Sequence, residues 1–294
     1  MKTSKNIISN YITESQSLMD RLQSDERGFE KISQIIKDKA GINMIKNSKN
    51  ITLMASRLSS VLKKHSLLNY KDYLKLLATD DSDIILELIS SLTTNTTHFF
   101  RESSHFDAFK SKINEFVEQK MKTHQYTFRI WCAASSTGQE IYTMLMVLLN
   151  QIPNYSNWDI KFLATDIDVE VLQKAADGIY QESEMENVPE LYRQQYFTKN
   201  NQFYHIKSEF RNLIRFAPFN LITEKYPFQH PFDFIFCRNV LIYFDRETAG
   251  SVIDKLGKSL RSNGCLFLGH SETGMMRSKF LKTISNGVYQ RIGG

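Results

Sequence analysis

Apolar side chains recur every three or four positions through the N-terminal third of the chain. This spacing runs from Phe29 to about Leu92 and predicts amphipathic helices, of which one covers residues 29–40 and another Asn50 to His65. No segment in this region alternates between apolar and polar residues as a half-buried strand does. Residues 29–92 are therefore predicted to form a small all-helical domain, and the polar residues 1–28 before it a loosely held leader.

A different pattern starts at about residue 126, where short apolar runs stand far apart with helical segments between them. The runs are FRIWCA, DIKFLAT, NLIRFAP, FDFIFC and CLFLGH. This alternation predicts βα units, and hence a mostly parallel, buried sheet in an α/β domain at residues 126–294. Two further runs, KFLKTIS and GVYQRI, are joined by Asn286 and Gly287, which predicts an antiparallel hairpin at the edge of the sheet.

Two stretches fall outside this alternation. Residues from about 181 to 211 are polar with several aromatic side chains, and they are interpreted as a small subdomain inserted into the α/β domain. Residues 93–125 separate the helical domain from the sheet and are interpreted as a linker. A length of 294 residues, 41% of them hydrophobic, suits two such domains.

Cysteine use, apolar run length and net charge narrow the class of protein. The three cysteines lie in separate apolar runs, so neither a disulfide framework nor a metal site is expected. The longest apolar run, Ile141 to Leu149, is too short to span a bilayer, and the N-terminus lacks a signal-peptide core, so a cytoplasmic protein without membrane insertion is expected. The net charge of +5 is a mild bias towards an acidic partner and too weak to indicate nucleic acid.

Candidate chemistry lies where the predicted strands end, because ligands of such sheets bind at the carboxyl ends of the strands. The first strand is followed by a small-residue loop with Gly138 and then Glu140, the second by Asp166, and FDFIFC by Arg238 and Asn239. Neither GxGxxG nor GxxxxGK[ST] is present, which argues against NAD and against a P-loop nucleotide. A loop with one glycine suits a ligand without phosphate. S-adenosylmethionine offers an amine for Glu140 and a ribose for Asp166.

Each acid has a simpler interpretation when it is taken alone. Glu140 could be a first-turn acid favoured by the helix dipole, and Asp166 could be the N-cap of the next helix. Both acids follow successive strands of one sheet, and this coincidence favours a binding site.

Six motifs then occur in order along the chain. They are TTNTTHFFRE (Thr93 to Glu102), STGQE (Ser136 to Glu140), ATDID (Ala164 to Asp168), FNL (Phe219 to Leu221), FDFIFCRNVLIYFD (Phe232 to Asp245) and GHSE (Gly269 to Glu272). From about Phe29 to Ile292 the chain resembles the CheR family, the chemotaxis receptor glutamate methyltransferases. The resemblance implies a Rossmann-like methyltransferase domain preceded by an all-helical domain. It also implies S-adenosylmethionine as cofactor, S-adenosylhomocysteine as product, and methyl-accepting chemotaxis receptors, which present an acidic helical bundle, as partners.

The resemblance also implies roles for single residues. It implies that the cofactor is bound by Asn95, Thr97, Arg101, Glu140, Asp166, Asn220, Leu221, Arg238 and Asn239. Arg101 and Tyr243 are implied to be catalytic and to line the transfer site, so residues 93–125 also contact the cofactor, while the insert touches the receptor. The chain departs from the family pattern at Gln139, where many members carry a second acid, and at Ile141, where many carry proline.

Methyl transfer to a glutamate needs positioning more than acid–base chemistry. A glutamate with a pKa of about 4.3 is already ionised at neutral pH, so no general base is required. An arginine can orient the carboxylate through two hydrogen bonds, and a tyrosine hydroxyl can fix the remaining geometry. Two alternatives stay open: a methyltransferase for another acceptor, and a catalytically silent S-adenosylmethionine-binding signalling module. The oligomeric state is not determined by the sequence.

A basic group on the predicted helix at Asn50 to His65 gives a candidate docking surface. Arg57 and Lys64 stand two turns apart, off the apolar face of this helix, with Lys63, Lys46 and Lys49 nearby. An ordinary solvated helix face would look the same. The acidic partner favours the interpretation as a surface that meets the receptor.

Overall fold

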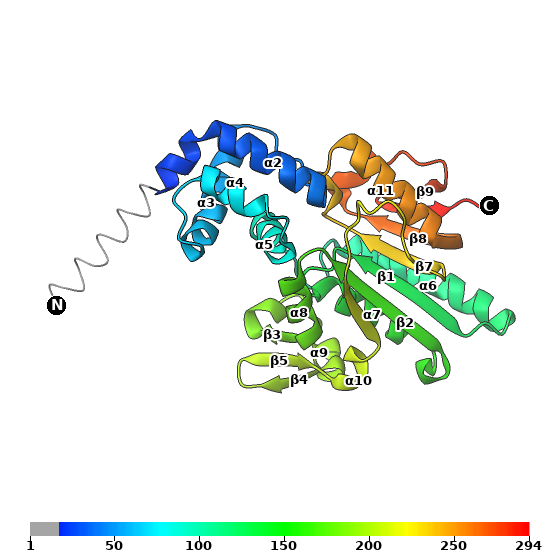
Figure 1. Ribbon diagram of the computed structural model, residues 1–294. Helices are drawn as coiled ribbons and strands as arrows, with labels where there is room; N and C mark the ends of the chain where they lie inside the picture. The colour runs from blue at the N-terminus through cyan, green and yellow to red at the C-terminus, as the bar shows by residue number, and fades with distance from the viewer. Residues whose placement is uncertain (1–17, 294) are drawn as a thin grey trace. The chain divides into compact units, whose positions relative to one another are not determined.

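The computed structural model describes residues 18–293, which divide into two compact units, one ending at Thr94 and the other beginning at Asn95 (Figure 1). The first unit is all-helical, as predicted. Its helices are α2 (Glu26–Ala40), α3 (Ser48–Lys64), α4 (Tyr70–Leu77) and α5 (Ser82–Leu92). Helix α2 ends where expected, because Gly41 takes the left-handed conformation, with φ of 76°, and donates its N–H to Lys37 O.

The predicted leader is wrong for its described part. Residues 18–24 are helical, and Leu18 and Leu22 are buried. The two leucines are four positions apart, so they share one helix face, and the polar residues around them hid this pattern. Asp25 then caps α2 by accepting a hydrogen bond from Gly28 N at 2.8 Å. Residues 1–17 of the predicted leader lie outside the described residues.

The second unit is built on a seven-stranded sheet in the order β6-β2-β1-β7-β8-β10-β9. Its strands are β1 (Thr127–Ala133), β2 (Asp159–Asp166), β6 (Ile214–Pro218), β7 (Phe232–Cys237), β8 (Leu260–Leu268), β9 (Leu281–Ser285) and β10 (Val288–Arg291). The first five pair in parallel, and β10 pairs antiparallel with β8 and β9. The mostly parallel sheet with an antiparallel edge hairpin is therefore confirmed.

Both faces of the sheet are buried under helices. Alternate residues of β1 belong to two different cores: Phe128, Ile130 and Cys132 pack with α7 (Gln139–Gln151), whereas Trp131 and Ala133 pack with α11 (Arg246–Ser259). Helix α8 (Val169–Asp177) follows β2. Burial on both faces explains why the strands read as continuous apolar runs.

The predicted linker at 93–125 is wrong for most of its length. Residues Ser103–Lys122 form the 20-residue helix α6, which belongs to the second unit. Its apolar face, with Phe106, Phe109, Ile113 and Phe116, is buried in the same core as α7. The methyltransferase unit therefore begins at Asn95 rather than at residue 126, because this helix is part of the core of that unit.

The inserted subdomain is confirmed and begins two residues earlier than predicted. It contains a three-stranded antiparallel sheet in the order β3-β5-β4. Its elements are β3 (Ile179–Gln181), η2 (Glu182–Met185), α9 (Glu190–Tyr196), β4 (Phe197–Asn200), β5 (Phe203–Ile206) and α10 (Ser208–Arg211). Aromatic contacts join it to the segment before α6: Phe99 packs edge-on to Tyr180, and Phe100 stacks on Tyr192. Among the described helices, none is both long and apolar enough to cross a bilayer.

Candidate functional site

The carboxyl ends of the parallel strands lie level at one edge of the large sheet. Ala133 pairs with Thr165 on one side and with Cys237 on the other, and Cys237 pairs in turn with Leu268. The loops that follow these strands therefore meet. They carry most of the site residues expected from the sequence.

The loop after β1 approaches the end of β2 through its backbone. Ser136 N donates to Asp166 Oδ2 at 2.8 Å, and Ser136 Oγ donates to Asn95 O at 2.9 Å. Gly138 begins α7 with φ of 95°, and a Cβ there would lie 2.8 Å from Tyr180 Oη. A side chain at position 138 would therefore both strain the turn and clash with the Tyr180 hydroxyl.

Asp166 is held by backbone groups on both oxygens. Besides Ser136 N, it accepts a hydrogen bond from Asp168 N at 3.1 Å. The N-cap of α8 is Asp168, which accepts from Glu170 N, so the alternative that Asp166 caps this helix is wrong. Burial raises the pKa of Asp166, although its backbone donors act in the opposite direction. Asn95 Nδ2 donates to Asp168 Oδ2 at 2.9 Å and thereby joins the same group.

Arg238, which follows β7, lies between two acids: Glu140, which follows β1, and Glu102, which precedes α6. Its side chain is fully buried, with Nη1 2.7 Å from Glu140 Oε2 and Nη2 2.8 Å from Glu102 Oε2. Nη2 also donates to Arg101 O at 2.8 Å. Glu140 is therefore more than a first-turn helix acid, because it balances a buried guanidinium.

Charges and burial act against each other within this group. Burial alone would raise the pKa of Glu102, but the hydrogen bond and charge of Arg238 hold it below its usual value. Burial would lower the pKa of Arg238, and Glu140 and Glu102 raise it instead. Burial, together with the charge of Arg238, lowers the pKa of His105 to about 4, so this imidazole is neutral at pH 7.

Glu102, His105 and His270 also form a cluster whose possible ligand atoms lie within 4.8 Å of one another. Arg238 occupies Glu102 Oε2 at 2.8 Å, and its positive charge opposes a metal ion beside it. His270 N donates to the same oxygen at 3.3 Å. We therefore assign this cluster to hydrogen bonding around Glu102.

The other expected residues lie around these two groups. Arg101 is half-buried and its Nη1 donates to Thr96 O at 2.9 Å, next to the half-buried Thr97. Tyr243 is half-buried at the end of η3 (Leu241–Tyr243). The Arg101 carbonyl accepts a hydrogen bond from Arg238, which joins Arg101 to the acid–arginine group. Tyr243 follows Arg238 along the same loop. No contact ties the Arg101 guanidinium to the Tyr243 hydroxyl among the hydrogen bonds of the described residues.

The loop after β6 lies against the end of β2. Phe219 N donates to Asp166 O at 2.8 Å, which puts Asn220 and Leu221 beside that strand end. Asn220 is half-buried and accepts a hydrogen bond from Ile222 N at 3.2 Å, and Leu221 is buried.

Glu272 has a place in the site that the sequence did not assign. It is 0% exposed and accepts hydrogen bonds from the backbone of Asn239 and Gly269, among others. Glu272 belongs to the GHSE motif, which by itself predicts no role for it. The signal was nevertheless present, because Glu272 follows β8 just as Asp166 and Glu140 follow their strands. Glu102, the last residue of TTNTTHFFRE, likewise has no role predicted from the sequence.

The acids retain capacity for a ligand. A carboxylate offers about four acceptor sites. Asp166 accepts backbone hydrogen bonds from Ser136, Ile167 and Asp168, and Glu140 uses two sites, for Cys132 Sγ at 3.3 Å and for Arg238. Buried Ser135 Oγ and Arg238 Nε lack a hydrogen-bond partner among the described residues. The strand ends therefore fit a ligand with a diol and an amine, as S-adenosylmethionine has.

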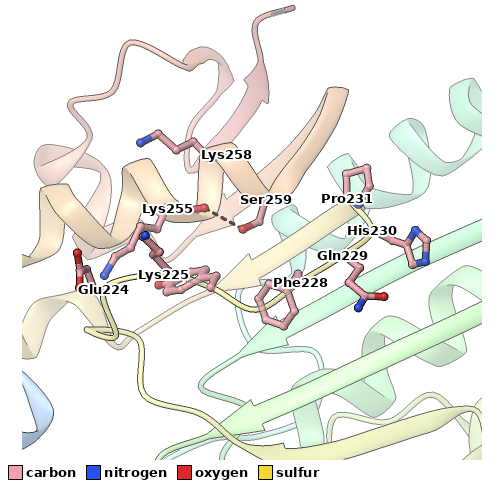
Figure 2. A pocket seen from close by; sticks show the side chains of 10 residues that line it. Glu224, Lys225, Phe228, Gln229, His230, Pro231, Lys255, Lys258 and Ser259 are labelled. Atoms are coloured by element: carbon pink, nitrogen blue, oxygen red, sulfur yellow. Dashed lines mark hydrogen bonds between the residues drawn. The ribbon is translucent and has the colours of Figure 1, made fainter.

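A separate cavity of about 500 Å³ lies between the segment before β7 and the end of α11 (Figure 2). It is lined by Glu224, Lys225, Tyr226, Phe228, Gln229, His230, Pro231, Lys255, Lys258 and Ser259. None of the site residues expected from the sequence lines it. The segment leads into the amino end of β7, so the cavity does not belong to the group at the carboxyl ends.

Comparison with known proteins identifies both units. A family model described as "CheR methyltransferase, all-alpha domain" matches residues 27–93, and one described as "CheR methyltransferase, SAM binding domain" matches residues 95–288. The chain is 36% identical over 265 residues to a chemotaxis protein methyltransferase of Borreliella burgdorferi, covering 89% of this chain and 93% of that protein. It is 35% identical over 261 residues to the chemotaxis protein methyltransferase of Escherichia coli, covering 87% of each.

The boundary between the two family models coincides with the boundary between the two structural units at residues 94 and 95. The acids at the strand ends lie in the unit that matches the cofactor-binding model. The chain therefore belongs to the CheR family of chemotaxis protein methyltransferases, with S-adenosylmethionine as its cofactor.

Proposed function

We propose that this protein transfers the methyl group of S-adenosylmethionine to glutamate side-chain carboxylates of chemotaxis receptors and forms glutamate methyl esters. The observation that carries the proposal is the pair of acids at neighbouring strand ends, Glu140 and Asp166, each fixed by a separate partner and each with acceptor capacity left. A cytoplasmic location is part of the same proposal.

The two acids divide the cofactor between them. Asp166 receives the ribose hydroxyls, because its oxygens lie at the end of β2 and retain acceptor capacity beside their backbone donors. Glu140 receives the amine, while Arg238 keeps the second oxygen in place. Asn220 and Leu221 border the adenine, since their loop lies against the Asp166 backbone.

The transfer step depends on alignment. The bound cofactor supplies a methyl group on a positively charged sulfur, which needs no metal or base to react with an ionised glutamate. Arg101 orients the receptor carboxylate, and Tyr243 fixes the remaining geometry. Holding reacting groups in line contributes roughly 7–11 kcal/mol in well-oriented systems. The buried side chains of Arg238 and Glu102 beside the transfer site keep water away from the receptor carboxylate.

Arg57, one of the two basic residues of α3 expected to face the receptor, is held within the helical unit. Arg57 is half-buried and donates to Leu92 O at 2.7 Å and to Thr93 O at 2.6 Å, so it caps the end of α5. Lys64 pairs with Glu87 at 2.7 Å. Replacing Arg57 would therefore disturb the helical unit itself. The insert near residues 181–211 is the better candidate for receptor contact.

A transfer assay on receptor-containing membranes with tritium-labelled S-adenosylmethionine tests the proposal. Methyl esters release labelled methanol in mild alkali, whereas methyl groups on nitrogen or carbon survive it. Label that resists alkali would favour a methyltransferase for another acceptor. Protein that binds the cofactor but transfers no label would favour the silent signalling module.

The transfer residues are tested in the same assay. Arg101→Ala is expected to reduce turnover severely at saturating substrate, and Tyr243→Phe less, because only a hydroxyl is lost. Arg215→Ala, an exposed arginine of β6, serves as the control for loss of a positive charge. Wild-type turnover in Arg101→Ala would remove this arginine from the reaction.

Cofactor binding is tested by calorimetry with S-adenosylhomocysteine. Asp166→Ala is expected to cost on the order of 1–3 kcal/mol of binding free energy, the usual scale for unpaired ligand hydroxyls. Asp159→Ala removes a partly exposed acid at the other end of β2 and should leave affinity unchanged. Unchanged affinity in both Asp166→Ala and Glu140→Ala would refute the assignment of the pocket.

A further inference from the structure

Glu272 lies where two loops of the site meet. It follows β8 in the short helix η4 (His270–Met275) and reaches the loop that follows β7. Its carboxylate is 0% exposed, and none of the ion pairs of the described residues includes it. A buried carboxylate without a cation needs another source of stabilisation.

Backbone N–H groups provide that stabilisation on both oxygens. Oε1 accepts from Val240 N at 2.8 Å and Leu241 N at 2.7 Å. Oε2 accepts from Asn239 N at 2.9 Å and Gly269 N at 2.6 Å. These donors fill the acceptor sites that a carboxylate has. Glu272 therefore has no capacity left for cofactor, receptor or water, and it acts only through the residues that it holds.

The held backbone has a conformation that needs such an anchor. Asn239 lies in the left-handed region with φ of 58°, and consecutive N–H groups from Asn239 to Leu241 converge on one point. Converging N–H groups of this kind form an anion-binding concavity. Without an anion there, the donors would be buried without partners, and the loop would relax.

The same loop carries the residues assigned to the reaction. Arg238 immediately precedes the first held N–H, and Tyr243 lies two residues after the last one, in η3. Asn239 Nδ2 also lies 3.5 Å from Glu102 Oε1, within the acid–arginine group. We infer that Glu272 is the positioning residue of the transfer site, fixing Arg238, Asn239 and Tyr243 by holding the backbone between them. The inference rests on the proposed function, which gives these residues their roles.

Glu272→Gln is the main test variant. It keeps the side-chain shape but replaces one oxygen by an amide that donates, so two backbone N–H groups of the site face a donor. In full-length protein, calorimetry with S-adenosylhomocysteine is expected to show affinity weakened roughly tenfold or more, the scale of one buried hydrogen bond lost to an unsatisfied group. Affinity within about twofold of the wild type would overturn the inference.

A matched control separates positioning from general stability. Asp233 is a buried carboxylate near the other end of β7, where it accepts from Arg129 N at 2.8 Å and pairs with Lys120 at 2.9 Å. Asp233→Asn should lower the unfolding temperature as Glu272→Gln does, yet leave affinity unchanged well below that temperature. Equal losses of affinity in the two variants would show that Glu272 is merely structural and would overturn the inference.

A second variant covers the case in which Glu272→Gln does not fold. Gly269 has φ of −61°, which alanine adopts readily, but a Cβ there would lie 2.8 Å from Glu272 Oε2 and 2.9 Å from Asn239 Nδ2. Gly269→Ala should weaken affinity in the same way, and unchanged affinity would overturn the inference. Asp166→Ala in the same assay tests the proposed cofactor pocket separately. If Asp166→Ala loses affinity while Glu272→Gln and Gly269→Ala do not, the positioning role of Glu272 is overturned and the proposed pocket stands.

Discussion

Arg238→Met offers a direct measure of what holds the acids of the site together. The methionine keeps the apolar part of the buried side chain and removes the guanidinium. Three contacts disappear: those to Glu140 at 2.7 Å, to Glu102 at 2.8 Å and to the Arg101 carbonyl at 2.8 Å. Two largely buried carboxylates then remain, and the positive charge between them is lost.

The loss of stability should be large for a single substitution. Removing one partner from a buried ion pair costs about 3–5 kcal/mol, because the remaining charge is left uncompensated. The side chains of Glu140 and Glu102 are only 12% and 17% exposed, so solvent compensates little. We therefore expect Arg238→Met to lower the free energy of unfolding by about 3–5 kcal/mol at pH 7.5.

The cost should also depend on pH, with a defined sign. The pKa of Glu102 lies below its usual value in the folded protein, against burial, because of Arg238. In the wild type this pair adds stability above the unfolded pKa of glutamate and loses it as the pH falls through the lower folded pKa. In the variant, burial raises the pKa of Glu102 without the opposing cation. Protonation of Glu102 then removes the cost of burying its charge. The difference between the two proteins should therefore shrink between pH 7.5 and pH 5.

Tryptophan fluorescence during urea unfolding measures the difference in unfolding free energy between the two proteins for the second structural unit. The chain has 2 tryptophans, Trp131 and Trp158, and both lie in the second unit. Lys199→Met is the matched control, since it breaks an exposed pair with Glu182 and should change stability by less than about 1 kcal/mol. A loss below about 1 kcal/mol for Arg238→Met at pH 7.5, or a loss that does not shrink at pH 5, would refute the reasoning.

Two further predictions concern residues whose contacts only the structure revealed. Gln139→Glu should destabilise the second unit by about 1–3 kcal/mol in the same fluorescence assay, because Gln139 Nε2 donates to Glu184 Oε1 at 3.0 Å and an acid at position 139 would repel Glu184. Adding Glu184→Gln should restore most of the lost stability, and no restoration would contradict this pairing. Arg57→Ala should speed amide hydrogen exchange in the last turn of α5, because Arg57 caps the carbonyls at the end of that helix. Lys71→Ala, which replaces an exposed lysine of α4, should not change this exchange. Equal exchange in both variants would show that the cap contributes nothing.

The architecture was largely readable from the sequence, because periodicity reflects which faces are buried. Strands buried on both faces appear as apolar runs, and the Asn286–Gly287 turn marked the edge hairpin. The failures share one cause. Residues 18–24 and α6 (Ser103–Lys122) carry apolar residues at helical spacing among many polar ones, so the local signal was present but weak, and only packing shows that these faces are buried.

The candidate site was predictable in its residues but not in its connections. Strand ends and motifs indicated Glu140, Asp166 and Arg238 one by one, because each follows an apolar run. Only the level ends of parallel strands put the Arg238 guanidinium on Glu140, 98 positions away in sequence. The same cause hid the role of Glu272, because three of its four donors come from the loop after β7.

The sequence by itself therefore determined the two units, the order of the strands along the chain and the residue types at the strand ends. The tertiary structure decided which charges pair, which basic residue caps a helix, and which acid anchors the loop after β7. Periodicity is a property of neighbouring residues and their faces, whereas charge pairing and backbone anchoring depend on distances between loops that only the folded sheet sets.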